Sequence, residues 1–189
     1  MDRQQCSDAQ LVALILQADD AAFAVLVTRY HRRVYGITYR MLGNVAEAED
    51  LCQEIFLRLY QQLPRYDQGM PFTPWLRRLA CNQVLNHLKK RSLKITPLEI
   101  KIGNEQQPRP IAAGQKDPEQ ALMAKYQDKQ LQQALLELPE NYRLAFTLKY
   151  VEDLTAEEIG ELLNIPRNTI KTWLVRAREA LRGKLSHDM

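Results

Sequence analysis

Residues 154–178, LTAEEIGELLNIPRNTIKTWLVRAR, predict two short helices joined by a tight turn. Thr155 and Glu158 have the spacing of a capping box, in which each side chain accepts a hydrogen bond from the other residue's backbone amide. Asn164 lies in the turn, where a left-handed backbone is often required and Asn tolerates it. Pro166 suits the first turn of the next helix because its φ is fixed near the helical value. The pattern therefore predicts a helix-turn-helix.

Gly160 lies inside the first of these helices, where glycine costs about 1 kcal/mol relative to alanine. We therefore expect another helix backbone to approach it closely. In the second helix, a period of 3.6 residues places four apolar side chains on the inner face: Ile170, Leu174, Ala177 and Leu181. The same period places Asn168, Thr172, Val175 and Arg176 on the outer face.

The outer face carries the chemistry of a DNA reader. Asn and Thr side chains exchange hydrogen bonds with base edges, whereas Lys and Arg at the margins neutralise phosphates. Arg176 suits either role. The predicted DNA-facing set of this helix is Arg167, Asn168, Thr169, Lys171, Thr172, Arg176 and Arg178.

Charge is segregated along the chain. The formal net charge of +3 says little about nucleic acid, but residues 164–185 carry six basic side chains against the single acid Glu179. Residues 117–161 are instead rich in acids. Local segregation of this kind is the electrostatic footprint of a DNA-binding surface. The alternative is a solvated basic helix that closes an all-α domain.

Composition points to an all-α protein. The 189 residues contain long segments rich in Leu, Ala, Glu, Lys, Arg and Gln, and no alternating strand pair or hairpin turn. No apolar run is long enough to span a bilayer, and residues 1–5 do not resemble a signal peptide, so we expect a soluble cytoplasmic protein. The three cysteines and three histidines are scattered, which predicts neither a disulfide framework nor a metal site.

The amino-terminal half predicts four helices. Ser7 with Gln10 opens the first, the second follows Asp20 and ends at Gly43, and the third lies between Asn44 and the Leu63-Pro64 pair. For the fourth helix we expect Thr73 as the cap, Pro74 at the first position and an end near Arg91. The third helix has an acidic face and the fourth is strongly basic.

Two small helical domains joined by a flexible linker account for this organisation. Periodicity fails from residue 92, where prolines and glycines interrupt a polar stretch. The expected boundaries are 1–91 for the first domain, 92–117 for the linker and 118–189 for the second domain. The second domain is predicted to hold four helices, of which the last two form the helix-turn-helix.

Three blocks of the sequence, in order and with matching spacing, resemble one family. They are YRMLGNVAEAEDLCQEIFLRLY (residues 39–60), FTPWLRRLACN (residues 72–82) and LPENYR (residues 138–143), which continues to residue 178. The chain resembles the extracytoplasmic-function sigma factors, group 4 of the sigma-70 family, which are two-domain promoter-specificity subunits of bacterial RNA polymerase. The resemblance covers nearly the whole chain.

The resemblance implies three surfaces. The third helix docks on the clamp helices of the polymerase's largest subunit through Glu47, Asp50, Gln53, Glu54 and Leu57. A carboxylate strip beside exposed apolar residues suits a protein partner and repels DNA, although an ordinary solvated helix face has the same composition. The helix-turn-helix reads the minus-35 element.

The fourth helix and the loop before it, by the same resemblance, contact the minus-10 element and capture its opened strand. The candidates are Tyr66, Asp67, Gln68, Trp75, Arg77, Arg78, Asn82, Asn86, Lys89, Lys90 and Arg91, with residues 66–70 as a pocket for a flipped base. Trp75 is open between two roles, packing in the core or stacking on a base.

Four positions depart from the family pattern. Asn86 stands where Asp is common, Arg167-Asn168 replaces a glycine-containing turn, and Trp173 stands where many relatives carry Arg. Because these side chains lie in or beside the reading faces, no relative's promoter sequence transfers to this chain.

The leading hypothesis is a sigma factor that binds the polymerase core and promoter DNA, needs no cofactor and is held by an anti-sigma factor. The second hypothesis is a stand-alone helix-turn-helix regulator that binds a two-fold-symmetric operator. The third, an enzyme, has the least support because the sequence lacks a phosphate-binding glycine loop, a nucleophile motif and a clustered acid-base pair.

Overall fold

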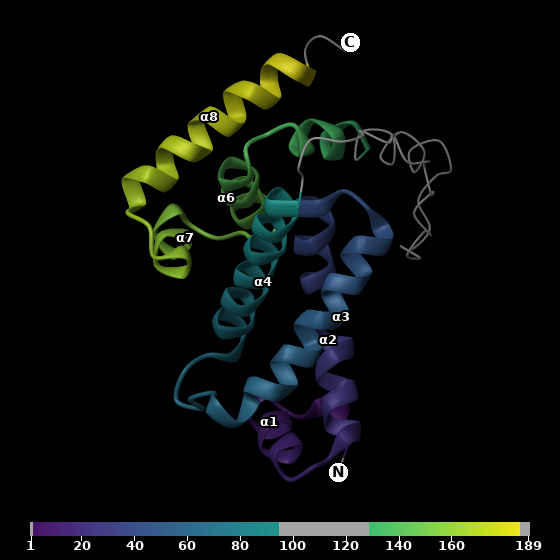
Figure 1. Ribbon diagram of the computed structural model, residues 1–189. Coiled ribbons are helices and arrows are strands. Elements are labelled where there is room, and N and C mark those ends of the chain that lie inside the picture. Colours follow the sequence, from purple (N-terminus) through teal and green to yellow (C-terminus); the bar gives the residue numbers. More distant parts are fainter. Residues whose placement is uncertain (1, 95–128, 186–189) are drawn as a thin grey trace, which may run out of the picture. The chain divides into compact units, whose positions relative to one another are not determined.

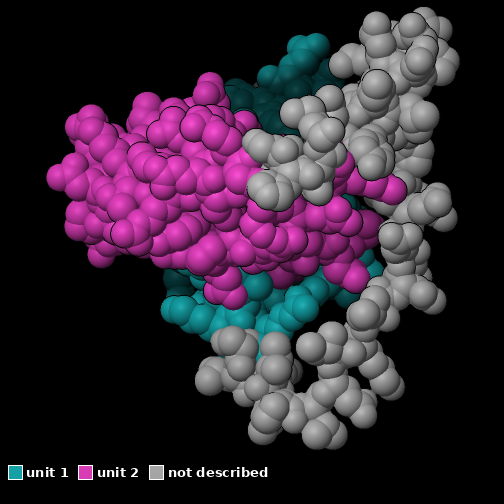
Figure 2. All heavy atoms as spheres, turned by 90° about the horizontal axis from the view of Figure 1, so that it is seen from above, with its two compact units in different colours: residues 1–39, 46–92 teal, residues 40–45, 93–189 magenta. Residues whose placement is uncertain are grey.

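The structure is a computed structural model that describes residues 2–94 and 129–185 of the chain. Within these residues the regular structure is entirely helical, so the all-α prediction is confirmed (Figure 1). The chain divides into two compact units, one formed by residues 1–39 and 46–92 and the other by residues 40–45 and 93–189 (Figure 2). Most of the predicted linker, residues 95–117, and the beginning of the predicted second domain, residues 118–128, lie outside the described residues.

The first 94 residues form four α-helices with two short 3-10 turns. These elements are η1 Arg3–Gln5, α1 Asp8–Leu16, α2 Asp20–Leu42, α3 Val45–Gln62, η2 Leu63–Arg65 and α4 Phe72–Lys94. The carboxy-terminal part has a helical segment at residues 129–136, followed by α6 Glu140–Tyr150, α7 Ala156–Leu163 and α8 Arg167–Leu185. The four predicted amino-terminal helices and the helix-turn-helix are therefore present.

Local sequence explains where several helices begin and end. Ser7 and Gln10 form the predicted capping box at the start of α1. Gly43, with a φ of 75°, ends α2 in a left-handed conformation that glycine adopts without steric cost. The helical periodicity of α2 and α3 is matched by burial, since Leu26, Ile37, Ile55 and Leu59 are all completely buried or nearly so.

The start of α4 differs from the prediction. The helix begins at Phe72, so Thr73 lies inside the first turn and does not act as the cap. The Thr73 hydroxyl lies 2.9 Å from the hydroxyl of Tyr30 on α2. A tertiary hydrogen bond has replaced the local one that the sequence pattern suggested, and the helix also runs three residues beyond the predicted end.

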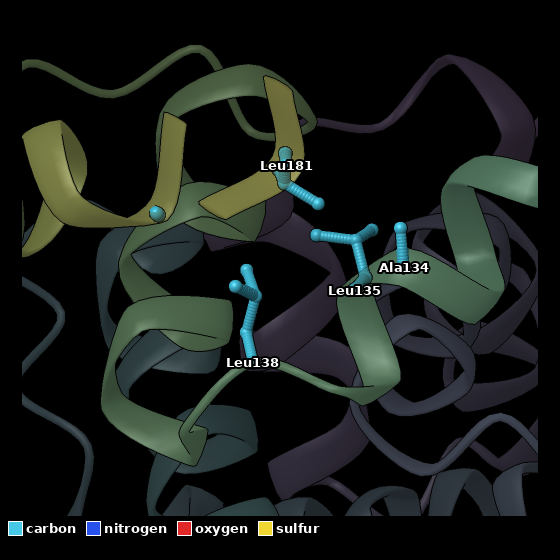
Figure 3. Packing of buried hydrophobic residues seen from close by; sticks show 5 residues of the cluster. Ala134, Leu135, Leu138 and Leu181 are labelled. Carbon is cyan, nitrogen blue, oxygen red and sulfur yellow. The ribbon is translucent and has the colours of Figure 1, made fainter. Parts of the chain in front are cut away.

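The carboxy-terminal unit is held by apolar contacts between the segment 129–136, α6 and α8. Figure 3 shows Leu135 and Leu181 pointing toward one another, with Ala134 and Leu138 beside them. The buried Arg143 closes this segment because its Nη2 donates hydrogen bonds to the carbonyl oxygens of Leu136 and Leu138, at 3.0 and 3.1 Å. These bonds satisfy carbonyls that the end of a helix leaves without an intrahelical partner.

The turn between α7 and α8 has the predicted geometry. Thr155 and Glu158 form the capping box, and Asn164 adopts a left-handed conformation with φ 56° and ψ 47°. A Cβ atom on Gly160 would lie 2.7 Å from the carbonyl oxygen of Ile165 and 3.5 Å from the backbone nitrogen of Arg167. The close backbone approach expected at Gly160 is therefore confirmed, and it comes from the turn itself and the first residue of α8.

We predict that Gly160→Ala lowers the free energy of unfolding of the carboxy-terminal unit by about 1–3 kcal/mol, because the new methyl group overlaps backbone atoms that cannot rotate away. Gly183→Ala in α8 is the matched control, since nothing lies within 4 Å of the position its Cβ would take. This control should gain about 0.5–1 kcal/mol. Urea unfolding followed by Trp173 fluorescence, in a Trp75→Phe background, measures both. Equal stability of the two variants would contradict the steric account.

Candidate nucleic-acid interface

The outer face of α8 gathers the side chains predicted to meet DNA. Ile170, Leu174, Ala177 and Leu181 are buried, and their packing against α6, α7 and residues 134–138 fixes the rotation of the helix about its axis. The residues on the rest of the helix surface are exposed: Arg167, Asn168, Lys171, Thr172, Val175, Arg176 and Arg178. Thr169 is half-buried. The face therefore carries amide, hydroxyl and guanidinium groups in one strip.

Three of these side chains have partners within the unit. Arg167 forms an ion pair with Glu157 of α7 at 3.3 Å, and the Thr172 hydroxyl donates to the carbonyl of Asn168 at 3.0 Å. Arg176 donates from Nη1 to the hydroxyl oxygen of Tyr142 on α6, also at 3.0 Å. This hydrogen bond raises the pKa of Arg176 above its ordinary value, so the side chain is cationic throughout the physiological range.

A second exposed strip lies on α3. Asp50, Gln53, Glu54 and Leu57 are exposed on the side opposite the buried stripe, and the Leu57 side chain has 63% of its surface accessible. Glu54 also lies 3.6 Å from Arg58, one turn further along the same helix. A carboxylate strip thus lies beside an exposed leucine, in line with the sequence pattern.

Glu47 differs from those four residues because it is half-buried and its carboxylate is bonded to α4. Its carboxylate accepts from Nε2 of His87 at 2.8 Å and lies 3.2 Å from Nη1 of Arg91, both on α4. The predicted polymerase contact Glu47 and the predicted DNA contact Arg91 are therefore ion-pair partners of one another. The sequence did not suggest this pairing because 44 positions separate the two residues.

The exposed face of α4 carries most of the other predicted DNA contacts. Arg78, Asn82, Asn86, Lys89 and Lys90 are exposed, at spacings that place them along one side of the helix. Arg77 is half-buried and lies about 100° away from Arg78 around the helix axis. The structure thus gathers five of the basic and amide residues and leaves Arg77 and Arg91 on other sides.

An aromatic cluster supports the loop before α4. Tyr66 is buried, its ring centroid lies 4.7 Å from that of Trp75, and both rings contact Phe72. The Tyr66 hydroxyl donates to the carbonyl of Met70, across the base of the loop, and burial raises the pKa of this phenol. Asp67 and Gln68 are exposed, and Asp67 accepts from the amide of Gly69 at 2.9 Å. Trp75 is half-buried, so it packs in this cluster and keeps part of its ring accessible.

Comparison with known proteins matches both units to one family. Residues 26–93 match the family model for Sigma-70 region 2 and residues 128–181 that for Sigma-70, region 4. The chain is 38% identical to the ECF RNA polymerase sigma factor SigW of Bacillus subtilis over 90% of its length and 92% of that protein. It is 30% identical to the RNA polymerase sigma-H factor of Pseudomonas aeruginosa, over 94% and 93% of the two chains.

The chain belongs to the extracytoplasmic-function sigma factors. The fold is also that of the sigma factor RpoE of Bartonella quintana in its complex with the anti-sigma factor NepR, with a TM-score of 0.68 and 18% identity over 88% of this chain and 98% of that one. A sigma factor directs RNA polymerase to promoters and initiates transcription. The hypothesis of a stand-alone operator-binding regulator is therefore not favoured.

Sequence reasoning missed three residues of this sigma factor that shape the interface. Tyr142 contacts Arg176, Phe72 joins Tyr66 to Trp75, and His87 bonds Glu47. Tyr142 and Phe72 lie inside the blocks that carried the family resemblance, which was a usable signal. His87 had no local signal, since its partner lies on another helix.

No group of three or more potential metal ligands forms among residues 2–94 and 129–185 of the sigma factor, and no helix in that part is long and apolar enough to cross a membrane. All three cysteines are buried, and none of them forms a disulfide. Burial raises the pKa of the Cys52 thiol to about 12, with the Glu49 carboxylate adding to the effect. Cys52 and Cys81 are completely buried and fill the core as small apolar side chains.

We predict that Cys52 resists alkylation by iodoacetamide at pH 8 in the folded protein, because only the thiolate reacts and burial disfavours it. Its folded pKa lies above the unfolded value near 9, so its contribution to stability is fully present below pH 9 and decreases as the pH rises toward 12. Peptide mass spectrometry with and without urea checks the first point. Rapid modification of Cys52 without urea would contradict it.

Proposed function

We propose that this sigma factor binds its partners through three helix faces. The outer face of α8 recognises the minus-35 element, and the exposed face of α4 with the loop 66–70 binds the minus-10 element. The acidic face of α3 binds the clamp helices of the polymerase's largest subunit. Residues 1–91 then act as region 2, residues 92–117 as a linker and residues 118–189 as region 4. The observation that carries the proposal is that each face lies opposite a buried apolar stripe.

The assignment of α8 to the minus-35 element is supported by the division of its exposed groups. Asn168, Thr172 and Arg176 offer donors and acceptors suited to base edges in the major groove. Lys171 and Arg178 flank them as cations suited to phosphates. Arg167 shares its charge with Glu157, so its pull on phosphate is weaker than that of the other two.

The assignment of α4 to the minus-10 element is supported by the joint presence of cations, amides and an accessible aromatic ring. Asn82 and Asn86 can recognise an unpaired base by its edge, and Trp75 offers part of its face. Tyr66 supports the loop through its hydrogen bond to Met70, and the exposed Asp67 and Gln68 are proposed to line a pocket for a flipped base.

Melting of the promoter duplex then follows from capture of the extruded bases. Contacts between these bases and the protein offset the few kcal/mol that unstacking costs, and no catalytic residue is needed.

The assignment of α3 to the polymerase core is supported by its exposed Leu57 among carboxylates. An apolar centre with a charged rim is the composition of a protein interface, and the negative charge discourages binding to DNA. Asp50, Gln53, Glu54 and Leu57 form the interface, whereas Glu47 acts within the fold by fixing α4 against α3.

An anti-sigma factor is the proposed regulator. The structural relative from Bartonella quintana was solved with such a partner bound, and the exposed faces of this chain offer surfaces that a partner can occupy. The protein works in the cytoplasm, where polymerase and promoter DNA are found, as a binding subunit and not as an enzyme.

Charge reversal on α3 tests the polymerase contact. We predict that Asp50→Lys with Glu54→Lys lowers affinity for bacterial RNA polymerase core at least tenfold, because like charges placed across an interface cost several kcal/mol. The control, Asp20→Lys with Glu140→Lys, makes the same change in net charge at exposed positions outside α3 and should bind core as the unmutated chain does. Binding is titrated without DNA. Absence of core binding by the unmutated chain would refute the proposal, and equal losses in both variants would refute the assignment to α3.

Two substitutions on α8 separate base reading from anchoring. We predict that Arg176→Ala changes which minus-35 bases are preferred, whereas Lys171→Ala weakens all promoters alike and lowers the salt dependence of binding by about one ion. The measurement is run-off transcription by reconstituted holoenzyme on a barcoded library with both promoter elements randomised. Losses that are equal for both variants and independent of sequence would remove the base-reading role of Arg176.

A further inference from the structure

Arg176, on the proposed reading face of α8, forms a hydrogen bond with a residue of another helix, α6. Its Nη1 donates to the hydroxyl oxygen of Tyr142 on α6 at 3.0 Å. Arg176 is exposed and Tyr142 is half-buried, so the hydrogen bond joins a surface side chain to one that is partly enclosed by the core. Guanidinium carries five N–H donors, and this bond uses only one of them.

Tyr142 is itself fixed by the core. Its ring packs against the buried cluster of the carboxy-terminal unit, formed by Ala134, Leu135, Leu138, Ala177 and Leu181. The ring of Trp173, which lies on α8 three residues before Arg176, has its centroid 6.4 Å from that of Tyr142. The next residue, Arg143, is bonded to the carbonyls of Leu136 and Leu138, which holds this turn of α6 in place. The phenol oxygen therefore has a defined position relative to α8.

We propose that Tyr142 is a positioning residue for base recognition, whose hydroxyl orients the guanidinium of Arg176 and thereby sets the minus-35 preference. The proposal rests on the proposed function of α8. Tyr142 lies on α6, outside the helix-turn-helix, and is a different kind of determinant from the exposed side chains of α8.

Geometry explains why orientation matters more for bases than for phosphates. A base edge accepts two parallel hydrogen bonds from arginine only when the plane of the guanidinium matches the plane of the base. A phosphate accepts from many directions. Arginine loses considerable rotamer freedom when it is fixed, and a partner that fixes it before DNA arrives reduces that loss on binding. Removal of the hydroxyl should therefore reduce base discrimination and leave the sequence-independent affinity nearly unchanged.

Tyr142→Phe tests the proposal because it removes the hydroxyl and keeps the ring in the core. The holoenzyme is assayed on the barcoded library with randomised promoter elements. We expect preference to fall about three- to tenfold, the value of one hydrogen bond, at the same minus-35 positions that Arg176→Ala alters. The salt dependence of binding and affinity for scrambled duplex should stay within about twofold of the unmutated chain, which a merely destabilised fold would not allow.

Tyr150→Phe is the matched control. Tyr150 lies on the same helix, two turns from Tyr142, and is 51% exposed. Its ring is tilted by 38° against that of Phe146, at a centroid distance of 4.5 Å, so the variant removes one tyrosine hydroxyl from α6 away from Arg176. We expect its base preference to equal that of the unmutated chain. The same shift in Tyr150→Phe as in Tyr142→Phe would overturn the proposal.

The double variant Tyr142→Phe with Arg176→Ala decides whether Tyr142 acts through Arg176. We expect it to match Arg176→Ala alone, because no guanidinium is left to orient. Independent, additive losses would overturn the positioning role, and so would an unchanged preference in Tyr142→Phe. If Arg176→Ala itself leaves every base preference unchanged, the proposed reading role of α8 fails. That outcome differs from failure of Tyr142 alone, in which Arg176→Ala still shifts the preference.

Discussion

Burial of one stripe of α8 against α6, α7 and residues 134–138 determines which of its side chains face solvent. Ile170 and Ala177 are completely buried, and Leu181 is nearly so. Because a helix is rigid about its own axis, this burial fixes the direction of every other side chain on α8. Packing thus selects the strip of α8 that is proposed to read bases, and the residues of that strip need only tolerate exposure to water in the free protein.

The turn before α8 fixes the direction in which this helix leaves α7, whereas the buried stripe fixes its rotation about its own axis. Gly160 and Asn164 act together, since one permits close backbone approach and the other supplies a left-handed residue. A side chain at position 160 would separate the two helices, and a β-branched residue at 164 would disfavour the positive φ. The geometry of a DNA reader depends here on two residues that have no contact with DNA in our assignment.

The sequence predicted what is local and missed what is long-range. Capping boxes, the left-handed Asn164 and the buried stripes are encoded within a few residues, so pattern and spacing were sufficient to find them. The pairing of Glu47 with Arg91 and the bond between Tyr142 and Arg176 join residues more than 30 positions apart. Periodicity predicts which face of a helix is exposed, but it does not predict which side chain of another helix forms a hydrogen bond with a residue on that face. Thr73 illustrates the same limit, because a local capping pattern was overridden by a hydrogen bond to Tyr30.

Separation of the core stripe from the reading strip lets specificity vary without loss of the fold. Arg167-Asn168 and Trp173, the departures from the family pattern in α8, avoid the four buried apolar positions of that helix. Trp173 nevertheless lies beside Tyr142, which bonds Arg176, so a change at this half-buried position can reach the side chain proposed to read bases through one intermediate ring. Under that proposal, a substitution at position 173 alters the orientation of Arg176 and leaves the exposed residues of α8 unchanged, so promoter preference can differ between sigma factors whose exposed α8 residues are identical.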